Sequence, residues 1–338
     1  MTSDFRTVTC IVYALCSVLF AQTHPTSTGE WLNSWRRTYS SDGHRFNKCL
    51  LQVDTEQCLM PRYVAPRSSL RRQQKIPKII WQTWKSYTIG RFQSVAMMSF
   101  IRDNLEYEYI LLDDAAALDF ICQHTDAKTA LAYEMLAVGA AKADVLRVAI
   151  LLEYGGVYVD ADCASLVPFN SFVWPNASVV SGIGAQGDFH QWVLLYVPGH
   201  PFLQRALQTI ICNIFDANIQ IKAVPVVEMT GPIAYHHGGV SHVLRSHNCT
   251  LSPAKAVSEM MELLSPTTSC ANLSRVAGVV QLMSADFLGH NIVFKDSKVV
   301  KERTEQGYVS YTAQERHVKT LFQDVQFLCN SHTRTLLS

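Results

Sequence analysis

An apolar helix, a glycine stop and a short strand follow one another directly in residues 143–162. The run 146–152 is apolar at every position except Arg147, which predicts a buried helix. Gly155-Gly156 supply the left-handed conformation in which helices commonly end. Residues 157–159 are β-formers and predict a strand. A buried helix that leads straight into a strand indicates an α/β protein.

Two carboxylates, Asp160 and Asp162, stand where that strand ends. In open α/β sheets, ligands gather at the carboxyl ends of the strands. Two acidic residues one apart can hold a hard divalent cation, which takes oxygen ligands and bridges to phosphates. A nucleotide-diphosphate sugar needs such a bridge, because its pyrophosphate repels carboxylates, and Mg²⁺ or Mn²⁺ would also stabilise the departing diphosphate. The alternative is a chance Asp-x-Asp triplet in a loop, because the pattern alone is weakly specific.

Asp144 and Arg147 lie three positions apart and therefore share one face of the predicted helix. One interpretation is a local ion pair, which contributes about 0.3–0.5 kcal/mol. The other places both side chains at the site, where Asp144 accepts hydrogen bonds from sugar hydroxyls and Arg147 contacts sugar or phosphate. Burying charges in so apolar a helix is costly, and this favours the functional interpretation.

The same residues resemble a family of Asp-x-Asp sugar transferases that includes the fungal initiating α-1,6-mannosyltransferase and the inositol-phosphorylceramide mannosyltransferases. More distant relatives are the α-1,4-galactosyltransferases and the large glucosylating toxins. The matching segments occur in the family's order. They are an opening strand at 76–84, a second strand with its acidic end at 107–114, a signature block at 142–162, and later landmarks at 199–202 and 229–232.

This resemblance implies a GT-A type nucleotide-sugar fold, with a mixed and mostly parallel sheet flanked by helices. It implies a metal-dependent, retaining glycosyltransferase that moves a hexose (mannose, galactose or glucose) from GDP-mannose or a UDP-hexose to a glycan or glycolipid hydroxyl. Asp160 and Asp162 would bind Mn²⁺ or Mg²⁺, and Asp144, Arg147 and Asp160 would bind the donor. These four residues are the expected catalytic set, with Asp113 or Asp114 near the acceptor cleft.

The chain departs from the family's pattern at two places. The opening motif often carries His where this chain has Trp81, and we expect this indole to lie beside the nucleotide base. Near the C-terminus the family commonly has a His-rich stretch followed by Ser-Trp, which helps bind metal and diphosphate. Residues 308–312 occupy that place here, with no Trp after them. His290 and His317 are the substitute candidates for a third metal ligand.

Runs that predict strands alternate with runs that predict helices from residue 76 onward, which is typical of a sheet covered by helices on both faces. Residues 22–74 show little periodicity and predict a stem or linker, so the expected catalytic domain is 75–338. The expected strands are 78–82, 107–112, 157–160, 179–183 and 192–197, and the expected helices are 91–103, 114–123, 128–153 and 201–215.

Residues 8–21 form an apolar run that follows Arg6. At about 14 residues this run is short for a membrane span and closer to a signal peptide, whereas members of the family are often signal-anchored. Residues 1–21 are therefore expected to be a signal anchor or a signal peptide, and a poor cleavage site favours the anchor. We expect a Golgi or other secretory-pathway membrane, with the catalytic domain lumenal; secretion is the alternative.

Glycosylation and disulfide signals agree with a lumenal location. Eight of the ten cysteines lie outside the apolar run, and an even number in an oxidising compartment predicts disulfides. The pairs to test first are Cys49 with Cys58 and Cys249 with Cys270, while Cys163 is expected to be a small buried side chain. The sequons are at Asn176, Asn248 and Asn272.

The composition points to no nucleic-acid partner, because the formal net charge is +1 and the isoelectric point about 7.6. The expected partners are the nucleotide sugar, a glycan or glycolipid acceptor, and the membrane through the N-terminal segment. Two rival interpretations stay open. One is a catalytically inactive relative that binds sugar or a partner protein, which rests on the altered tail. The other is a metal hydrolase, which normally needs more His or carboxylate ligands than the signature block provides.

Overall fold

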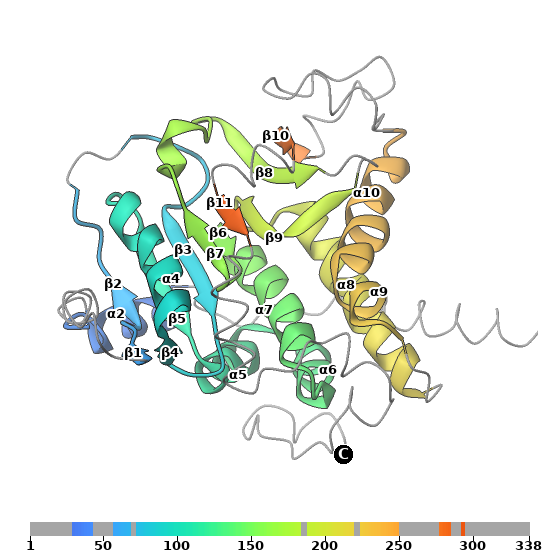
Figure 1. Ribbon diagram of the computed structural model, residues 1–338. Helices are drawn as coiled ribbons and strands as arrows, with labels where there is room; N and C mark the ends of the chain where they lie inside the picture. The colour runs from blue at the N-terminus through green and yellow to red at the C-terminus, as the bar shows by residue number, and fades with distance from the viewer. Residues whose placement is uncertain are drawn as a thin grey trace, which may run out of the picture.

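The computed structural model describes residues 29–42, 57–68, 72–183, 188–219, 224–249, 277–284 and 292–294. Their centre is a seven-stranded sheet with the strand order β10-β8-β9-β6-β3-β5-β2 (Figure 1). The strands are β2 (Tyr63–Val64), β3 (Ile79–Thr83), β5 (Glu108–Leu112), β6 (Gly156–Val159), β8 (Ala177–Ile183), β9 (Phe189–Tyr196) and β10 (Val279–Ser284).

The sheet is mixed and mostly parallel, as predicted. Strand β3 pairs in parallel with β5 and β6, and β8 pairs in parallel with β10. Strand β9 runs antiparallel to both β6 and β8, and β2 runs antiparallel to β5. Consequently β10, β8, β6, β3 and β5 share one direction, and the carboxyl ends of β3, β5 and β6 meet at the same edge.

Helices cover both faces of this sheet, and alternate residues of each strand enter different cores. The helices are α2 (Glu30–Thr38), α4 (Arg91–Asp103), α5 (Asp114–His124), α6 (Ala127–Met135), α7 (Gly139–Tyr154), α8 (Pro201–Ile219), α9 (Val226–Met229), α10 (Ser241–Ser246), the 3-10 turn η1 (Phe169–Ser171) and the π-helix η2 (Ala234–Val240). Trp81 of β3 and Tyr158 of β6 belong to a core formed with α2 and α5 to α10, whereas Ile80 and Val157 belong to a second core formed with α4. Two small antiparallel pairs join β1 (Gln57–Leu59) to β4 (Thr88–Gly90) and β7 (Cys163–Ser165) to β11 (Ile292–Phe294).

The helix predicted over 128–153 is two helices. The chain leaves α6 at Leu136 and enters α7 from Val138, and both residues have extended backbone angles. Both side chains are fully buried in the larger core. Tertiary packing therefore overrides helix propensity at this point. All five predicted strands are present, with ends displaced by a few residues.

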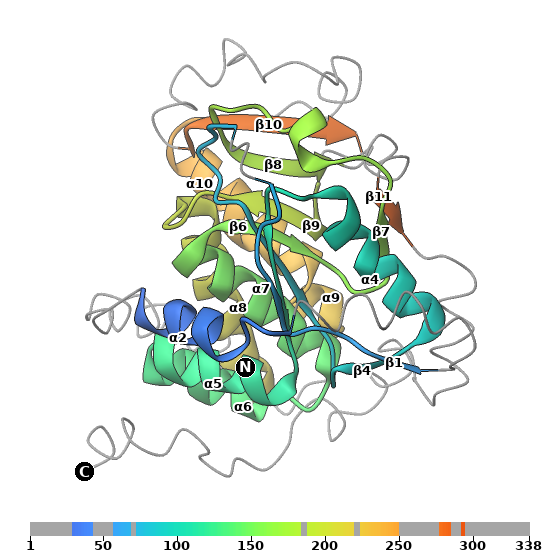
Figure 2. The same cartoon turned by 90° about the vertical axis from the view of Figure 1, so that its left-hand side faces the viewer.

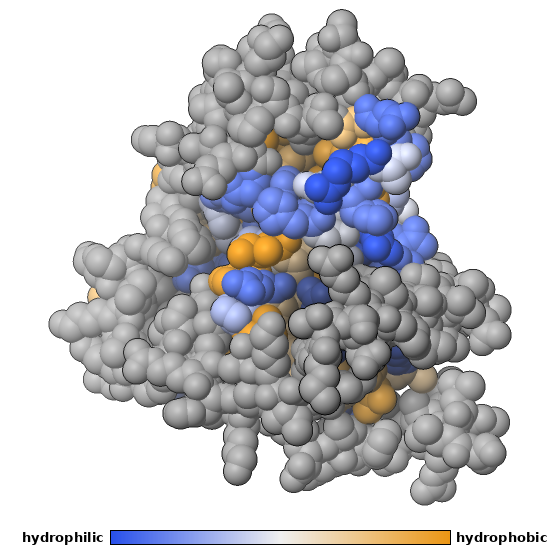
Figure 3. Space-filling model, turned by 90° about the vertical axis from the view of Figure 1, so that its right-hand side faces the viewer, coloured by the Kyte–Doolittle hydropathy of each residue, from blue (hydrophilic) through white to orange (hydrophobic). Residues whose placement is uncertain are grey.

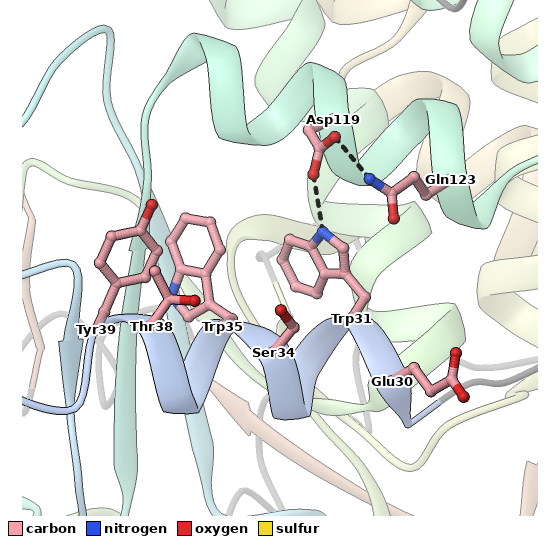
Figure 4. A pocket seen from close by; sticks show the side chains of 8 residues that line it. All are labelled: Glu30, Trp31, Ser34, Trp35, Thr38, Tyr39, Asp119 and Gln123. Carbon is pink, nitrogen blue, oxygen red and sulfur yellow. Dashed lines mark hydrogen bonds between the residues drawn. The ribbon is translucent and has the colours of Figure 1, made fainter. Parts of the chain in front are cut away.

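Part of the predicted stem is folded onto the domain, so the stem prediction is wrong for residues 30–38. Trp31 and Trp35 of α2 are buried in the same core as α5 and α7, and Figure 2 shows α2 beside α5. Arg36 donates two hydrogen bonds to Glu108 of β5, at 2.7 and 2.8 Å. Trp31 donates to Asp119 of α5 at 3.0 Å, at the wall of a pocket of about 370 Å³ between the two helices (Figure 4).

The remaining N-terminal and cysteine predictions are tested only in part. Residues 1–21, and with them the predicted apolar segment, lie outside the described residues. Among the described residues, no helix has the length and apolarity needed to cross a membrane. Cys58, Cys122 and Cys249 are disulfide-bonded. The proposed partners Cys49 and Cys270 lie outside the described residues.

Candidate functional site

The connection from α7 to β6 depends on two glycines, as predicted. The N–H of Gly155 donates to the carbonyl of Leu151 at 2.9 Å, and Gly155 and Gly156 have φ of +63° and +100°. A Cβ on Gly155 would lie 2.7 Å from the carbonyl oxygen of Tyr196, and one on Gly156 would lie 2.6 Å from that of Ile79. Only glycine lets β6 start here, between β3 and β9.

Arg147 contacts two of the predicted acidic residues, Asp144 and Asp160. Its Nη2 atom lies 3.3 Å from Oδ1 of Asp144 and 2.9 Å from Oδ1 of Asp160. The Arg147 and Asp144 side chains are each 8% exposed, and that of Asp160 is 25% exposed. The structure therefore brings together three of the four predicted catalytic side chains. It also excludes a surface ion pair between Asp144 and Arg147, because both are buried and the pair extends to β6.

Two further guanidinium nitrogens of Arg147 have main-chain partners. Nη1 of Arg147 donates to the carbonyl of Gln191 at 3.0 Å, and Nε donates to that of Ala143 at 3.3 Å. The guanidinium carbon lies 4.9 Å from the centre of the Tyr158 ring. A planar fork with donors in several directions fits these partners, whereas a single ammonium would not.

Burial and charge act against each other in this cluster. Burial raises the pKa of Asp144, and Arg147 and the hydrogen bond from Thr230 oppose that rise. Burial also raises the pKa of Asp160 to about 7; Arg147 opposes the shift, whereas Asp162 and Asp144 add to it. The pKa of Arg147 is raised: burial lowers it, but Asp160, Tyr158 and Asp144 outweigh burial. A cation beside Asp160 would therefore favour its ionised form.

Main-chain bonds fix the turn that carries Asp160 and Asp162. The N–H of Asp160 donates to the carbonyl of Trp192 at 3.0 Å, and the N–H of Cys163 donates to the carbonyl of Asp160 at 3.1 Å. Gln82 of β3 donates from Nε2 to the same Asp160 carbonyl at 3.3 Å. Asp162 is half-buried, and Cys163 is fully buried as predicted.

The described residues offer two carboxylates at this turn, those of Asp160 and Asp162, as metal-binding groups. Among the described parts of the chain, no three His, Cys, Asp or Glu side chains gather to hold a metal ion. Mg²⁺ is commonly held by one or two carboxylates together with substrate phosphates and water, which Asp160 and Asp162 fit. The candidates His290 and His317 and the segment 308–312 lie outside the described residues, so the third ligand stays a prediction.

The structure contradicts Trp81 as a contact for the nucleotide base. Its indole is 1% exposed, donates from Nε1 to the carbonyl of Gly155 at 2.9 Å, and stacks on Tyr154 with ring centres 5.8 Å apart. A base would find no open ring face there. Trp81 instead ties β3 to the glycine turn. Trp84, which directly follows β3 at its carboxyl end, is half-buried.

The acidic end of β5 has a local structural role. Asp113 is the N-cap of α5, and its carboxylate accepts the N–H of Ala116 at 2.9 Å. Asp114 begins α5 and is exposed. Because a cap of this kind contributes about 1 kcal/mol by itself, the Asp113 side chain needs no ligand to explain its presence. A role of either residue at the acceptor cleft stays a prediction.

Two buried polar residues were missed by the sequence reasoning. Gln82 accepts the hydroxyl of Tyr109 at 2.9 Å, in addition to its bond to the Asp160 turn. The hydroxyl of Thr230 donates to Oδ2 of Asp144 at 2.8 Å. Both lie inside segments that resemble the family, 76–84 and 229–232. The sequence signal that could have found them is a polar residue among apolar neighbours, because such a residue needs a hydrogen-bond partner when it is buried.

Two buried histidines are structural. His200 of the landmark 199–202 accepts the N–H of Phe202 at Nδ1 (3.2 Å), and its Nε2 pairs with the carbonyl of Ala277 (2.9 Å). His236 accepts the N–H of Phe189 at Nδ1 and therefore donates from Nε2 to the hydroxyl of Ser241, each at 3.0 Å. A histidine that donates to a serine is no general base for it. Figure 3 shows the side of the molecule that lies on the right in Figure 1, where hydrophilic side chains surround a few hydrophobic ones.

The comparisons with known proteins agree on the family. Residues 91–179 match the model described as "Glycosyltransferase sugar-binding region containing DXD motif". Inositol phosphoceramide mannosyltransferase 3 of Schizosaccharomyces pombe is 33% identical over 163 residues, 47% of this chain and 43% of that protein. The initiation-specific alpha-1,6-mannosyltransferase of the same yeast is 30% identical over 184 residues, 46% of each chain. Mannosyl phosphorylinositol ceramide synthase SUR1 of Saccharomyces cerevisiae is 30% identical over 168 residues, 48% of this chain and 41% of that protein.

A solved structure of the PaToxG glycosyltransferase is similar at 16% identity and a TM-score of 0.37, over 62% of this chain and 79% of that one, a likeness too distant to carry an argument about the site. This chain spans less than half the length of the three yeast relatives named above. The matched range nevertheless contains Asp144, Arg147, Asp160 and Asp162. Residues 91–179 of this chain are therefore similar to the DXD-containing sugar-binding region of the glycosyltransferases.

Proposed function

We propose that this chain is a metal-dependent glycosyltransferase of the GT-A type that moves a hexose from a nucleotide-diphosphate sugar to a glycan or glycolipid hydroxyl, with retention. The family match and the yeast relatives support the reaction class. Mannose is the first donor sugar to test, because those relatives are named mannosyltransferases. A glycolipid is the first acceptor class to test, because one of them is named for inositol phosphoceramide.

The buried Arg147, bound to both Asp144 and Asp160, is the observation that carries this proposal. Burying the charged side chains of Asp144 and Arg147 costs several kcal/mol, and apolar residues of similar volume would serve a core at least as well. The cluster also lies where α7 and the carboxyl end of β6 meet, the edge at which α/β sheets bind ligands. A ligand with hydroxyls and phosphates accounts for charges kept at this place.

Each side chain then has a defined task. Asp144 accepts hydrogen bonds from sugar hydroxyls, and Arg147 orients the donor while it holds Asp144 and Asp160 in place. Asp160 and Asp162 would hold Mn²⁺ or Mg²⁺, which when bound neutralises the diphosphate and stabilises it as leaving group. Trp84 replaces Trp81 as the proposed aromatic contact of the nucleotide base, because it follows the carboxyl end of β3 and is half-buried.

The proposed location is the Golgi or another secretory-pathway membrane, with this domain in the lumen and residues 1–21 as the anchor. Asn176 and Asn248, two of the three sequons, are exposed. Cys58, Cys122 and Cys249 are disulfide-bonded, which is typical of an oxidising compartment. Both features support a lumenal domain, and cleavage of the anchor would give a secreted form.

A donor screen tests the proposal. The purified protein is incubated with GDP-mannose, UDP-galactose and UDP-glucose, with and without Mn²⁺, and released nucleoside diphosphate is measured. We expect Mn²⁺-dependent release from one donor, accelerated by a glycan or glycolipid acceptor. Binding of a donor without release would instead support the inactive sugar-binding relative, which the altered tail favours. Hydrolysis of phosphate esters without sugar transfer would identify a metal hydrolase.

A further inference from the structure

We propose that Thr230 is a positioning residue that sets the orientation of the Asp144 carboxylate toward the donor sugar. Thr230 lies 86 positions from Asp144 in the sequence and outside the matched range 91–179. The inference rests on the proposed function, because it assigns to Thr230 a task in the same site. The Thr230 hydroxyl contacts Asp144, and the Thr230 carbonyl accepts Nε2 of Gln191 at 3.5 Å.

The two oxygens of the Asp144 carboxylate have different partners. Oδ2 accepts the Thr230 hydroxyl at 2.8 Å, and Oδ1 lies 3.3 Å from Nη2 of Arg147. A carboxylate offers about four lone-pair positions, so two remain for other donors such as sugar hydroxyls. With one oxygen bound from each side, the plane of the carboxylate cannot rotate freely, and the directions of the remaining lone pairs are fixed.

Thr230 itself is held rigidly at the end of α9. Its N–H donates to the carbonyl of Val226 at 2.9 Å, and its side chain is fully buried. Asn213 of α8 donates from Nδ2 to the carbonyl of the preceding Met229 at 3.1 Å. The following Gly231 is required, because a Cβ there would lie 2.7 Å from Cα of Val227. The turn therefore presents the hydroxyl to α7 in one place.

The hydroxyl has one proton and two acceptors within reach. The carbonyl of Val226 lies at 3.4 Å and the Asp144 carboxylate at 2.8 Å. The contact with Asp144 has the usual length of an O–H···O hydrogen bond and the contact with Val226 does not, so the proton goes to Asp144. The Thr230 methyl group contributes only packing, and the two contributions can be separated by substitution.

Thr230→Val keeps the shape and removes the hydroxyl, whereas Thr230→Ser keeps the hydroxyl and opens a small cavity. If Thr230 orients Asp144, Thr230→Val lowers kcat/KM at least about tenfold, mainly through kcat, and Thr230→Ser stays within a factor of about three. Affinity for the free nucleoside diphosphate stays unchanged in both variants. If Thr230 only fills space, the order reverses, and Thr230→Ser is the more damaged variant.

Thr209→Val is the matched control, because Thr209 is also buried and its hydroxyl donates to a main-chain carbonyl, that of Gly238, at 2.9 Å. This variant should keep wild-type kinetics with a similar loss of thermal midpoint. Wild-type kinetics for Thr230→Val, or equal losses in Thr230→Val and Thr209→Val, would overturn the positioning role. Absence of turnover in the wild-type protein with every donor would instead overturn the proposed function, which keeps the two failures distinct.

Discussion

Arg147 of α7 holds Asp160 of the following strand end, with Nη2 of the guanidinium 2.9 Å from Oδ1 of the carboxylate. The helix and the acid pair are thereby joined across the glycine turn, by a side chain that also binds the carbonyl of Gln191 on β9. Arg147 thus links α7, the carboxyl end of β6 and β9. This contact makes Arg147 the position where a conservative substitution is most informative.

Arg147→Lys should lower kcat/KM at least about tenfold, which corresponds to about 1.4 kcal/mol of transition-state stabilisation. Lysine keeps the charge, but it loses the planar fork that serves two carboxylates and a carbonyl together. Steady-state kinetics with the donor found in the screen measure the effect. Arg36→Lys is the control, because Arg36 also makes two bonds to a carboxylate, that of Glu108, but is partly exposed and lies in α2. Equal and near-normal kinetics for both variants would restore the local ion-pair interpretation.

The two tryptophans near β3 should behave differently. Trp81→Phe should lower the thermal midpoint, because it removes a buried hydrogen bond to Gly155 and part of the contact with Tyr154. Its affinity for the nucleotide should stay unchanged. Trp84→Leu should weaken nucleotide binding several-fold, since base–aromatic stacking contributes about 1–3 kcal/mol. Calorimetric titration with GDP and UDP separates the cases; weakened binding in the Trp81 variant alone would contradict the assignment.

Acid should destabilise the fold through its buried histidines. Burial lowers the pKa of His200 to about 4, and burial together with His237 and Arg245 lowers that of His236 to about 4 against an opposing effect of Asp188. The folded protein therefore binds fewer protons than the unfolded chain between pH 6.5 and 4. The stabilisation is fully present above pH 6.5 and is lost as pH falls toward 4, by up to about 3 kcal/mol for each histidine.

Thermal midpoints measured from pH 7.5 to 4.5 check this prediction. In His200→Asn the amide oxygen can still accept the N–H of Phe202, because Asn is a good helix N-cap, but it does not titrate. The variant should therefore start lower at pH 7.5 and lose less on acidification than the wild type. The exposed His247→Asn should follow the wild-type curve. An identical acid slope in His200→Asn and the wild type would contradict the argument.

The elements of the site were predictable where local chemistry decides them. The end of the helix at Gly155-Gly156 was predictable from the backbone conformation that glycine allows. The end of the strand near Asp160 was predictable because a run of β-formers gives way there to polar residues. The pairing of Asp144 with Arg147 was predictable because residues three positions apart lie on the same face of a helix. Charged residues within an apolar run are also costly to bury, which indicates a function.

The parts that depend on long-range packing were not predictable. The sequence does not show which face of the sheet Trp81 of β3 lies on. Both faces of β3 are buried, so the residues that point to either face are apolar. Thr230 reaches Asp144 from a turn far along the chain, and no local pattern records that approach. The helix at 30–38 carries two buried tryptophans among polar residues, so its docking onto α5 depends on a surface that the local sequence does not contain.

The most direct test of the whole account is nucleoside-diphosphate release by the Asp162→Asn variant across a Mn²⁺ titration. The change is nearly isosteric and removes one carboxylate charge, so the thermal midpoint should stay close to that of the wild type while the metal site is weakened. We expect release to fall at least about a hundredfold, near the detection limit, even in saturating Mn²⁺. Asp103→Asn, which changes the partner of the exposed Arg102 at the end of α4, should release nucleotide at the wild-type rate. Wild-type release by Asp162→Asn in saturating Mn²⁺ would contradict the assignment of Asp160 and Asp162 as the metal-binding pair.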